Sequence, residues 1–160
     1  MRIIGIDPGL AICGYCILDV DSDDEYSIIT SGSIQTDKKC SRPERLLEIH
    51  NDLKEIINTH KPDIAAVEQI FYFKNAKSII PVCESRGVIT MTLQMHNIQV
   101  CEYTPLVVKQ VITGYGRADK SDVKQMVETI MRSDNIPNLD DAVDAIAIAI
   151  CHARHKEILL

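Results

Sequence analysis

Apolar residues alternate with polar ones or form short runs in the first part of the chain, and they recur at helical spacing beyond Ser41. Arg2 to Asp7 is predicted to be a strand that ends in a turn at Pro8-Gly9. Ile12 to Leu18 should form a hairpin with it, and Tyr26 to Thr36 supplies a third strand. Three consecutive strands favour an antiparallel meander.

The middle of the chain changes to a helical period. Ser41 and Glu44 have the spacing of a capping box, and apolar residues follow every three or four positions until Lys61-Pro62. Asp63 to Glu68 is almost continuously apolar up to its final carboxylate, as expected of a central strand. The remaining pattern predicts a helix from Lys77 to Met95, a strand from Ile98 to Tyr103, and helices from Pro105 to Ile112, from Lys120 to Arg132 and from about Leu139.

This order of elements indicates an α/β fold. We expect a mixed five-stranded sheet, with three antiparallel strands extended by two parallel ones and helices on both faces, as in ribonuclease H-like proteins. The chain has 160 residues and is 46% hydrophobic, which suits one domain spanning 1–160 with its own core.

The ends and the cysteines bear on location. The N-terminal residues lack the apolar stretch of a signal peptide, and no apolar run reaches the length of a membrane span, so we expect a soluble cytoplasmic protein. Six scattered cysteines fit a reducing compartment. Cys13 and Cys16 form a Cys-x-x-Cys sequence within a predicted strand, where they would face opposite sides, so a redox or zinc role is disfavoured.

The charge distribution is uneven. A net charge of −6 and a pI near 5.3 argue against nucleic-acid binding. Acidic residues gather between Asp19 and Glu25 without the spacing of a calcium loop, which predicts a solvated turn. Basic residues recur elsewhere and leave room for a basic face: Lys74, Lys77 and Arg86, then Lys109, Arg117, Lys120 and Lys124.

Four carboxylates are predicted to meet. Asp7 and Glu68 end two strands that neighbour each other in a ribonuclease H-like sheet, and Asp141 and Asp144 share one face of the last helix. So much like charge calls for cations, and all-oxygen ligands suit Mg²⁺ or Mn²⁺. Two such ions about 4 Å apart would support phosphodiester hydrolysis.

Structural roles compete with this reading. Asp7 before Pro-Gly is ordinary turn chemistry, and Asp140 or Asp141 suits a helix cap. Glu68 is harder to explain structurally, because burying an unpaired carboxylate costs several kcal/mol. Asp144, which small apolar residues surround, poses the same problem.

The ordered motifs of the chain resemble those of the RuvC family of Holliday-junction resolvases over nearly its whole length. The matching blocks are Gly5-Ile6-Asp7-Pro8-Gly9 with Gly14-Tyr15, Glu68-Gln69-Ile70-Phe71, Lys74-Asn75-Ala76, Ser85-Arg86-Gly87-Val88, Val108-Lys109-Gln110, Lys120-Ser121, and the run from Asp141 to Ala149.

The resemblance implies a metal-dependent endonuclease that cuts four-way DNA junctions in recombination and repair. Asp7, Glu68, Asp141 and Asp144 would be catalytic and hold Mg²⁺, two ions per site, with Mn²⁺ as a substitute. Lys120 would assist near the scissile phosphate. Phe71 would contact DNA, and Lys109 would be another active-site or DNA-contacting lysine. From the charge pattern, we expect the recurring basic residues to bind DNA as well: Lys74, Lys77, Arg86, Arg117 and Lys124. Phe71 would stack at the opened junction centre, whereas the adjacent Tyr72 and Phe73 suit either a DNA contact or the core.

A two-fold homodimer is also implied, with the helix from Lys77 to Met95 as its interface, together with the branch-migration proteins RuvA and RuvB as partners. The chain stops at Leu160 without the basic tail of some relatives. His152 and His155 are interpreted as exposed and incidental. Two alternatives remain. One is a nuclease or ATPase elsewhere in the ribonuclease H and actin-like superfamily, although 160 residues are too few for the second domain that the ATPases need. The other is a junction-binding protein without catalysis.

Overall fold

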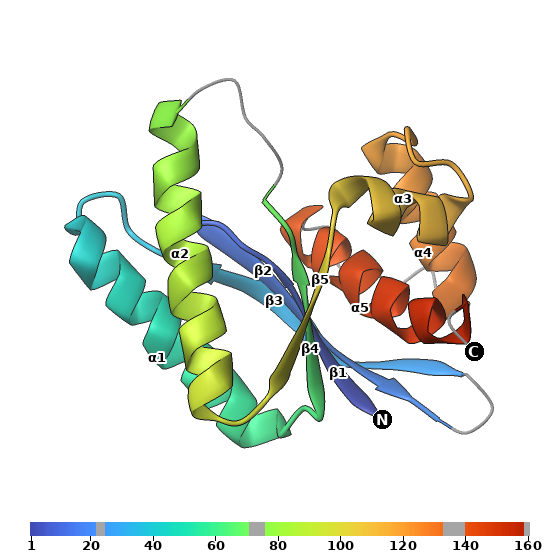
Figure 1. Ribbon diagram of the computed structural model, residues 1–160, viewed down its shortest axis with the longest axis horizontal. Helices are drawn as coiled ribbons and strands as arrows, with labels where there is room; N and C mark the ends of the chain where they lie inside the picture. Colours follow the sequence, from blue (N-terminus) through green and yellow to red (C-terminus); the bar gives the residue numbers. More distant parts are fainter. Residues whose placement is uncertain (22–24, 71–75, 133–139, 159–160) are drawn as a thin grey trace.

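The computed structural model describes residues 1–21, 25–70, 76–132 and 140–158. Its centre is a five-stranded sheet in the order β3-β2-β1-β4-β5 (Figure 1). β1 pairs antiparallel with β2 and parallel with β4, and β4 pairs parallel with β5, so the predicted mixed sheet is confirmed. The strands are β1 (Arg2–Asp7), β2 (Ile12–Val20), β3 (Tyr26–Gln35), β4 (Ile64–Glu68) and β5 (Gln99–Tyr103).

Helices cover both faces of the sheet. Two of them, α1 and α2, lie on one face, while α5 packs on the other face with α3 and α4 outside it (Figure 1). Their bounds are α1 (Arg42–His60), α2 (Ala76–Met95), α3 (Pro105–Thr113), α4 (Lys120–Met131) and α5 (Asp140–Ile158).

Local sequence explains where the helices begin and end. α1 begins at the predicted capping box of Ser41 and Glu44, and Lys61 ends it in the left-handed conformation.

One prediction was wrong in detail: Asp19 belongs to β2 rather than to a solvated turn. Its carboxylate forms an ion pair of 2.7 Å with Arg2 of the neighbouring strand, which keeps the strand paired at this point.

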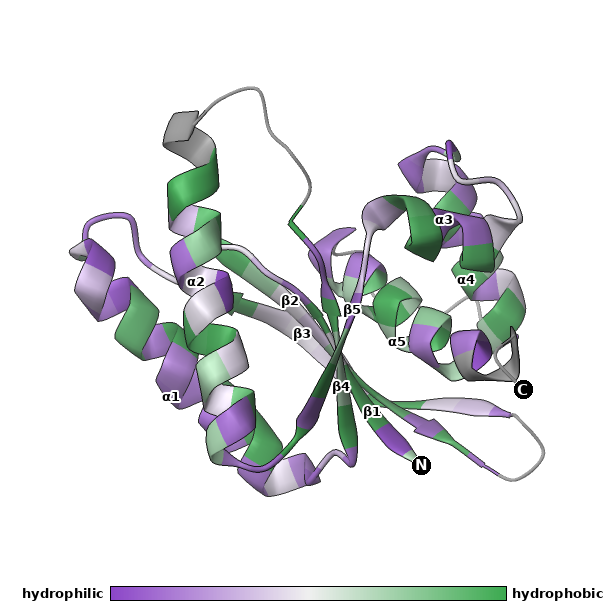
Figure 2. Ribbon diagram, in the orientation of Figure 1, coloured by the Kyte–Doolittle hydropathy of each residue, from purple (hydrophilic) through white to green (hydrophobic). Residues whose placement is uncertain are grey.

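Alternation along the strands divides the core into two layers. In β1, Ile3 faces α5, whereas Ile4 faces α1 and α2. Cys13 and Cys16 point to opposite layers, as predicted, and all six cysteines are free thiols. Figure 2 shows that α5 is largely hydrophobic, while hydrophilic residues mark much of α1. A helix that is apolar around most of its circumference is buried on several sides.

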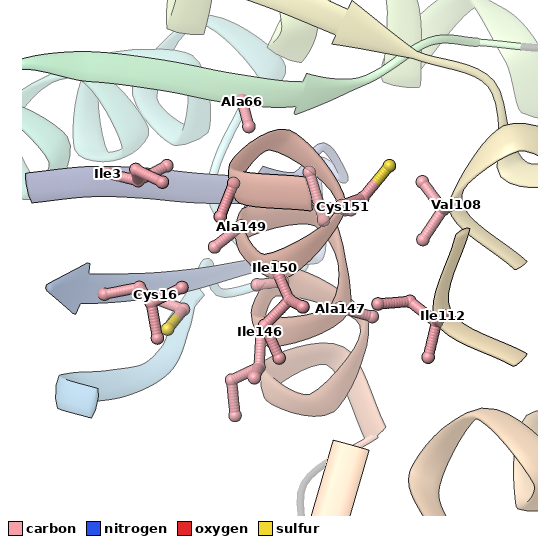
Figure 3. Packing of buried hydrophobic residues seen from close by; sticks show 14 of the residues in the cluster. Ile3, Cys16, Ala66, Val108, Ile112, Ile146, Ala147, Ala149, Ile150 and Cys151 are labelled. Carbon is pink, nitrogen blue, oxygen red and sulfur yellow. The ribbon is translucent and has the colours of Figure 1, made fainter. Parts of the chain in front are cut away.

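Helix α5 lies between the sheet and α3. Figure 3 shows Ile146 and Ala149 beside strand residues Ile3 and Cys16, with Val108 and Ile112 of α3 on the far side of the helix. All of these side chains are buried in one cluster. Because α5 is held on two sides, the position of its first turn along the sheet is fixed by core packing.

Two glycines bring α5 unusually close to the sheet. A Cβ atom at Gly5 would lie 2.2 Å from the carbonyl oxygen of Ala145, and one at Gly14 would lie 2.1 Å from the carbonyl oxygen of Asp141. No larger residue fits without moving the helix. The backbone of α5 therefore rests directly on β1 and β2, and its N-terminal turn is held over the carboxyl end of β1.

Candidate active site

The carboxyl ends of β1 and β4 place two carboxylates side by side. The parallel register pairs Ile6 with Val67, so the next residues, Asp7 and Glu68, emerge together at the same end of the sheet. The strands before them are buried, and both acidic side chains are half-buried. Burial at this edge was predicted from the apolar run that ends in Glu68.

The first turns of α5 bring two more carboxylates to the same edge. Gly14 pairs with Asp7 across β1 and β2, and its Cα lies against the backbone of Asp141. Asp144 follows three positions later on the same face of the helix. Both aspartates interact electrostatically with Asp7, so the four carboxylates lie close enough to influence one another.

Crowding makes ionisation costly at this site. Burial raises the pKa of Asp7 to about 8, and the charges of Glu68, Asp144 and Asp141 add to the rise. Burial also raises the pKa of Glu68 to about 7, with Asp144 adding to it, while a side-chain hydrogen bond with Asp7 opposes the shift. Carboxyl groups that resist ionisation through burial, and secondly through one another's charges, are typical of a functional site that binds cations.

Two lysines lie close to the carboxylates. Nζ of Lys120, the first residue of α4, lies 3.1 Å from Oδ2 of Asp144, and this hydrogen bond raises the pKa of Lys120. Asp119 caps the helix and so fixes where Lys120 starts. The charge of Lys109 in α3 partly offsets the rise in the pKa of Glu68, so this lysine is also near the carboxylates. Both predicted active-site lysines are therefore at the carboxylate cluster.

The other predicted DNA contacts have different surroundings. Lys124 lies one turn after Lys120 and shares with it a surface hollow of about 270 Å³ that Asp144 also lines. Arg117 is exposed just before α4. Arg86 of α2 forms an ion pair with Glu102 of β5. Lys77 is in α2, where its side chain is not described, and Phe71, Tyr72, Phe73 and Lys74 lie outside the described residues.

The interpretation of His152 as exposed was wrong. His152 is buried in α5, with 1% exposed, and its Nδ1 lies 2.7 Å from the hydroxyl of Tyr103 in β5. The ring of His155 packs edge-on against the same tyrosine. Tyr103 pairs in register with Glu68, so these contacts tie α5 to the strand beside the carboxylates. No sequence pattern links residues this far apart in the chain.

The donor set of the cluster suits a hard divalent cation. All four candidate ligands are carboxylates, and oxygen ligands favour Mg²⁺ or Mn²⁺ over metals that prefer nitrogen or sulfur. Among the described residues, no three His, Cys, Asp or Glu side chains are already arranged as a metal-binding group. The fit to a cation therefore rests on the chemistry of the donors and on their mutual repulsion.

Known proteins are similar to this chain along nearly its whole length. Residues 3–152 match the family model of crossover junction endodeoxyribonuclease RuvC. The chain is 44% identical over 152 residues to the crossover junction endodeoxyribonuclease RuvC of Caldicellulosiruptor saccharolyticus, which covers 95% of this chain and 92% of the relative.

Two solved structures are also similar over the whole fold. The structure of Thermus thermophilus RuvC has a TM-score of 0.90 at 27% identity, and the alignment covers 99% of this chain and 96% of that one. T. thermophilus RuvC in complex with Holliday junction substrate has a TM-score of 0.89 at 25% identity, with the same coverage. In the part of this chain that the structure describes, no helix is long and apolar enough to cross a membrane.

Proposed function

Because the chain belongs to the RuvC family of crossover junction endodeoxyribonucleases, it is a Holliday-junction resolvase endonuclease, and we propose that it cuts the junction by cation-dependent hydrolysis. The observation that supports this chemistry is the set of carboxylates at one edge of the sheet. Asp7 and Glu68 are half-buried there, and the charges of Asp144 and Asp141 oppose the ionisation of Asp7. A purely structural cluster would not gather this much like charge.

Asp7, Glu68, Asp141 and Asp144 would hold Mg²⁺, with two ions per site and Mn²⁺ as a substitute. When bound, the cations supply positive charge that polarises the phosphate and makes water more acidic. The carboxylates would hold the cations in a fixed position, because the close contacts of α5 with Gly5 and Gly14 fix this helix on the sheet. They also bring enough negative charge to require cations before a phosphate can approach.

Lys120 acts from the rim of the site. Its ammonium group donates to Asp144 and is still largely exposed, at 70% of its side chain. A phosphate bound at the carboxylates would therefore lie near the Lys120 ammonium group, which Asp144 holds in place. We assign to Lys120 the stabilisation of charge that grows on the phosphate oxygens in the transition state, with Lys109 beside it as a second cation near Glu68.

Positive side chains around this edge would bind the DNA backbone. Arg117 and Lys124 lie within four residues of Lys120 in the chain, Lys74 and Lys77 form part of a second basic segment, and the family resemblance adds the aromatic Phe71. Phosphate contacts fix the position of the duplex arms, whereas an aromatic side chain can stack on bases at the opened centre. Binding that depends on this basic edge should weaken steeply with salt despite the net charge of −6.

A homodimer would provide two such sites. α2 exposes apolar side chains at Ile80, Met91 and Met95, which are 51%, 51% and 64% exposed. Pairing of two copies through α2 would cover them and relate two sites by a two-fold axis, as paired cuts in a four-way junction require. RuvA and RuvB as partners, a role in DNA repair and a cytoplasmic location belong to the same proposal.

Cleavage of a synthetic mobile four-way junction in Mg²⁺ tests the proposal, with a linear duplex of the same sequence as the control. Wild type should give paired nicks in the junction alone, and Glu68→Gln should bind the junction without cutting it. Omitting the metal should also stop cleavage. Binding without cleavage by wild type, in every metal and junction sequence tried, would instead indicate a junction-binding protein without catalysis.

A further inference from the structure

Two adjacent residues of α2 reach toward the strand ends that carry the carboxylates. The first is Ser85, which is completely buried. Its hydroxyl Oγ donates a hydrogen bond of 3.0 Å to the carbonyl oxygen of Gly9. Gly9 lies two residues after Asp7, so this bond holds the backbone just after Asp7 in place.

The turn that Ser85 contacts has little freedom. A Cβ atom at Gly9 would lie 2.0 Å from the carbonyl oxygen of Ile12, so the chain is tightly folded there. Thr36 donates through its hydroxyl to the carbonyl of Leu10 at 2.6 Å, and Arg45 of α1 donates to that same hydroxyl. Bonds from Thr36, which follows β3, and from α1 thus hold one side of the turn, and Ser85 holds it from α2.

The second residue is Arg86, whose guanidinium forms an ion pair with Glu102 of β5. Glu102 lies opposite Val67 in the parallel register, the residue immediately before Glu68. The side chain of Arg86 is only 24% exposed, and its Nε is buried without a hydrogen-bond partner among the described residues. Such a guanidinium is oriented by the protein and has limited freedom to turn toward DNA.

We propose that Ser85 and Arg86 are positioning residues, which together set the spacing between the strand end of Asp7 and the strand end of Glu68. The inference rests on the proposed function. One turn of α2 contacts the turn that follows β1 and the strand β5, and β1 and β5 lie on either side of β4. A small displacement of α2 would therefore move one carboxylate relative to the other. Misplacement of reacting groups by about 1 Å can cost on the order of 100-fold in rate.

This assignment differs from the expectation that Arg86 binds DNA, and the two make opposite predictions. A positioning role predicts that Arg86→Gln and Glu102→Gln both lower the single-turnover cleavage rate at saturating junction, by about 10-fold. Junction Kd should stay within about twofold. Ser85→Ala should act in the same direction. The double variant Arg86→Glu/Glu102→Arg restores the ion pair with its charges exchanged, and it should recover most of the rate.

A second ion pair of α2 provides a matched control. Arg42 of α1 pairs with Glu84 of α2 at 3.3 Å, one residue before Ser85, but this pair ties α2 to α1 and not to a strand end. Arg42→Gln should therefore leave the saturating rate unchanged. If Arg86→Gln instead weakens junction binding, reduces the salt dependence by about one phosphate contact and leaves the saturating rate intact, Arg86 contacts DNA and the positioning role is overturned.

Hydrogen exchange tests the same link without any cleavage, so it can fail separately from the proposed function. In the DNA-free protein, Ser85→Ala should speed amide exchange in residues 9–11, and Arg86→Gln should speed it at the end of β5 near Glu102. Arg42→Gln should change neither segment. Unaltered exchange at both strand ends in the first two variants would refute the inference, whatever the nuclease activity of the wild-type protein.

Discussion

Nζ of Lys120 and Oδ2 of Asp144 lie 3.1 Å apart, and this pair joins the first turn of α4 to the start of α5. The lysine side chain is 70% exposed, whereas that of Asp144 is 30% exposed. Exposed ion pairs contribute about 0–1 kcal/mol to stability, so this contact is a weak structural link. Because the pair lies beside three further carboxylates, we expect it to affect cleavage more than folding.

Replacing Lys120 should therefore slow cleavage without unfolding the protein. We expect Lys120→Gln to lower the single-turnover rate on a junction by roughly 100-fold or more, because a charge that acts on the transition state is lost. The melting temperature should change little. Lys124→Gln, one turn further along the same helix, should weaken junction binding and leave the saturating rate nearly intact. Equal rate losses in the two variants would contradict the role assigned to Lys120.

The burial of Asp7, together with repulsion from the other carboxylates, predicts a gain in stability for Asp7→Asn in the absence of metal. The pKa of Asp7 is raised from its ordinary value to about 8, so the folded state favours the protonated form. In wild type, the stability linked to this group is fully present below the ordinary pKa and is lost as pH rises toward 8. Asparagine carries no such penalty. In EDTA, the variant should exceed wild type by more than about 1 kcal/mol at pH 8, with a smaller difference at pH 5.

Adding Mg²⁺ should reverse the order of the two proteins. A cation that binds the folded state raises its stability by RT ln(1 + [L]/Kd), and wild type has one more carboxylate for it than Asp7→Asn. Chemical denaturation with and without 10 mM metal, on the order of typical assay concentrations, measures both effects. If wild type and the variant unfold alike across pH and metal concentration, the four carboxylates do not share a cation site.

The close approach of Gly14 to α5 gives a third prediction. A Cβ atom there would lie 2.1 Å from the carbonyl oxygen of Asp141, so Gly14→Ala must push the first turn of α5 away from the sheet. We expect a loss of about 1–3 kcal/mol in the free energy of unfolding. Cleavage should fall further than the unfolded fraction explains, because Asp141 and Asp144 move with the helix.

Gly87 provides the matched control, since it is a glycine within α2 whose added Cβ atom would meet nothing within 4 Å. Gly87→Ala should raise stability by roughly 0.5–1 kcal/mol, as alanine favours a helix. The two variants should thus change the unfolding midpoint in opposite directions in urea. A Gly14→Ala protein as stable and as active as wild type would mean that α5 tolerates displacement from the sheet.

Elements of the fold could be predicted from sequence where their signals are local. The capping box at Ser41 marks the start of α1, and the apolar run before Glu68 marks β4 as a central strand. The meeting of Asp7 and Glu68 follows from two strand ends at one edge of a parallel pair, so it was also predictable. These features depend on residue type and spacing within a few positions.

Contacts between distant segments could not be predicted in the same way. Ser85 donates to a carbonyl 76 positions earlier in the chain, and Arg86 pairs with Glu102 across α2 and β5. A buried serine and a semi-buried arginine have no periodic signature, and their partners depend on how α2 lies on the sheet. The sequence pattern therefore favoured a DNA contact for Arg86 and was silent on Ser85.

The hydrogen bond between Tyr103 and His152 gives a final prediction, on stability. The Tyr103 hydroxyl and Nδ1 of His152 are both buried and 2.7 Å apart, and burial raises the pKa of Tyr103 to about 12, so the phenol stays neutral at physiological pH. Tyr103→Phe removes the hydroxyl and leaves that nitrogen without this bond in the core. The expected loss is about 1–3 kcal/mol in the free energy of unfolding.

Tyr115 supplies the control, because it is 60% exposed and Tyr115→Phe should change stability by less than about 0.5 kcal/mol. The comparison isolates the effect of burial, since each variant deletes one tyrosine hydroxyl. Replacing His152 by phenylalanine should lower the free energy of unfolding less in the Tyr103→Phe background than in wild type, because the two residues are partners in one hydrogen bond. If Tyr103→Phe is as stable as Tyr115→Phe, the bond does not hold α5 to β5, and the alignment of the carboxylates must rest on Gly5, Gly14 and core packing alone.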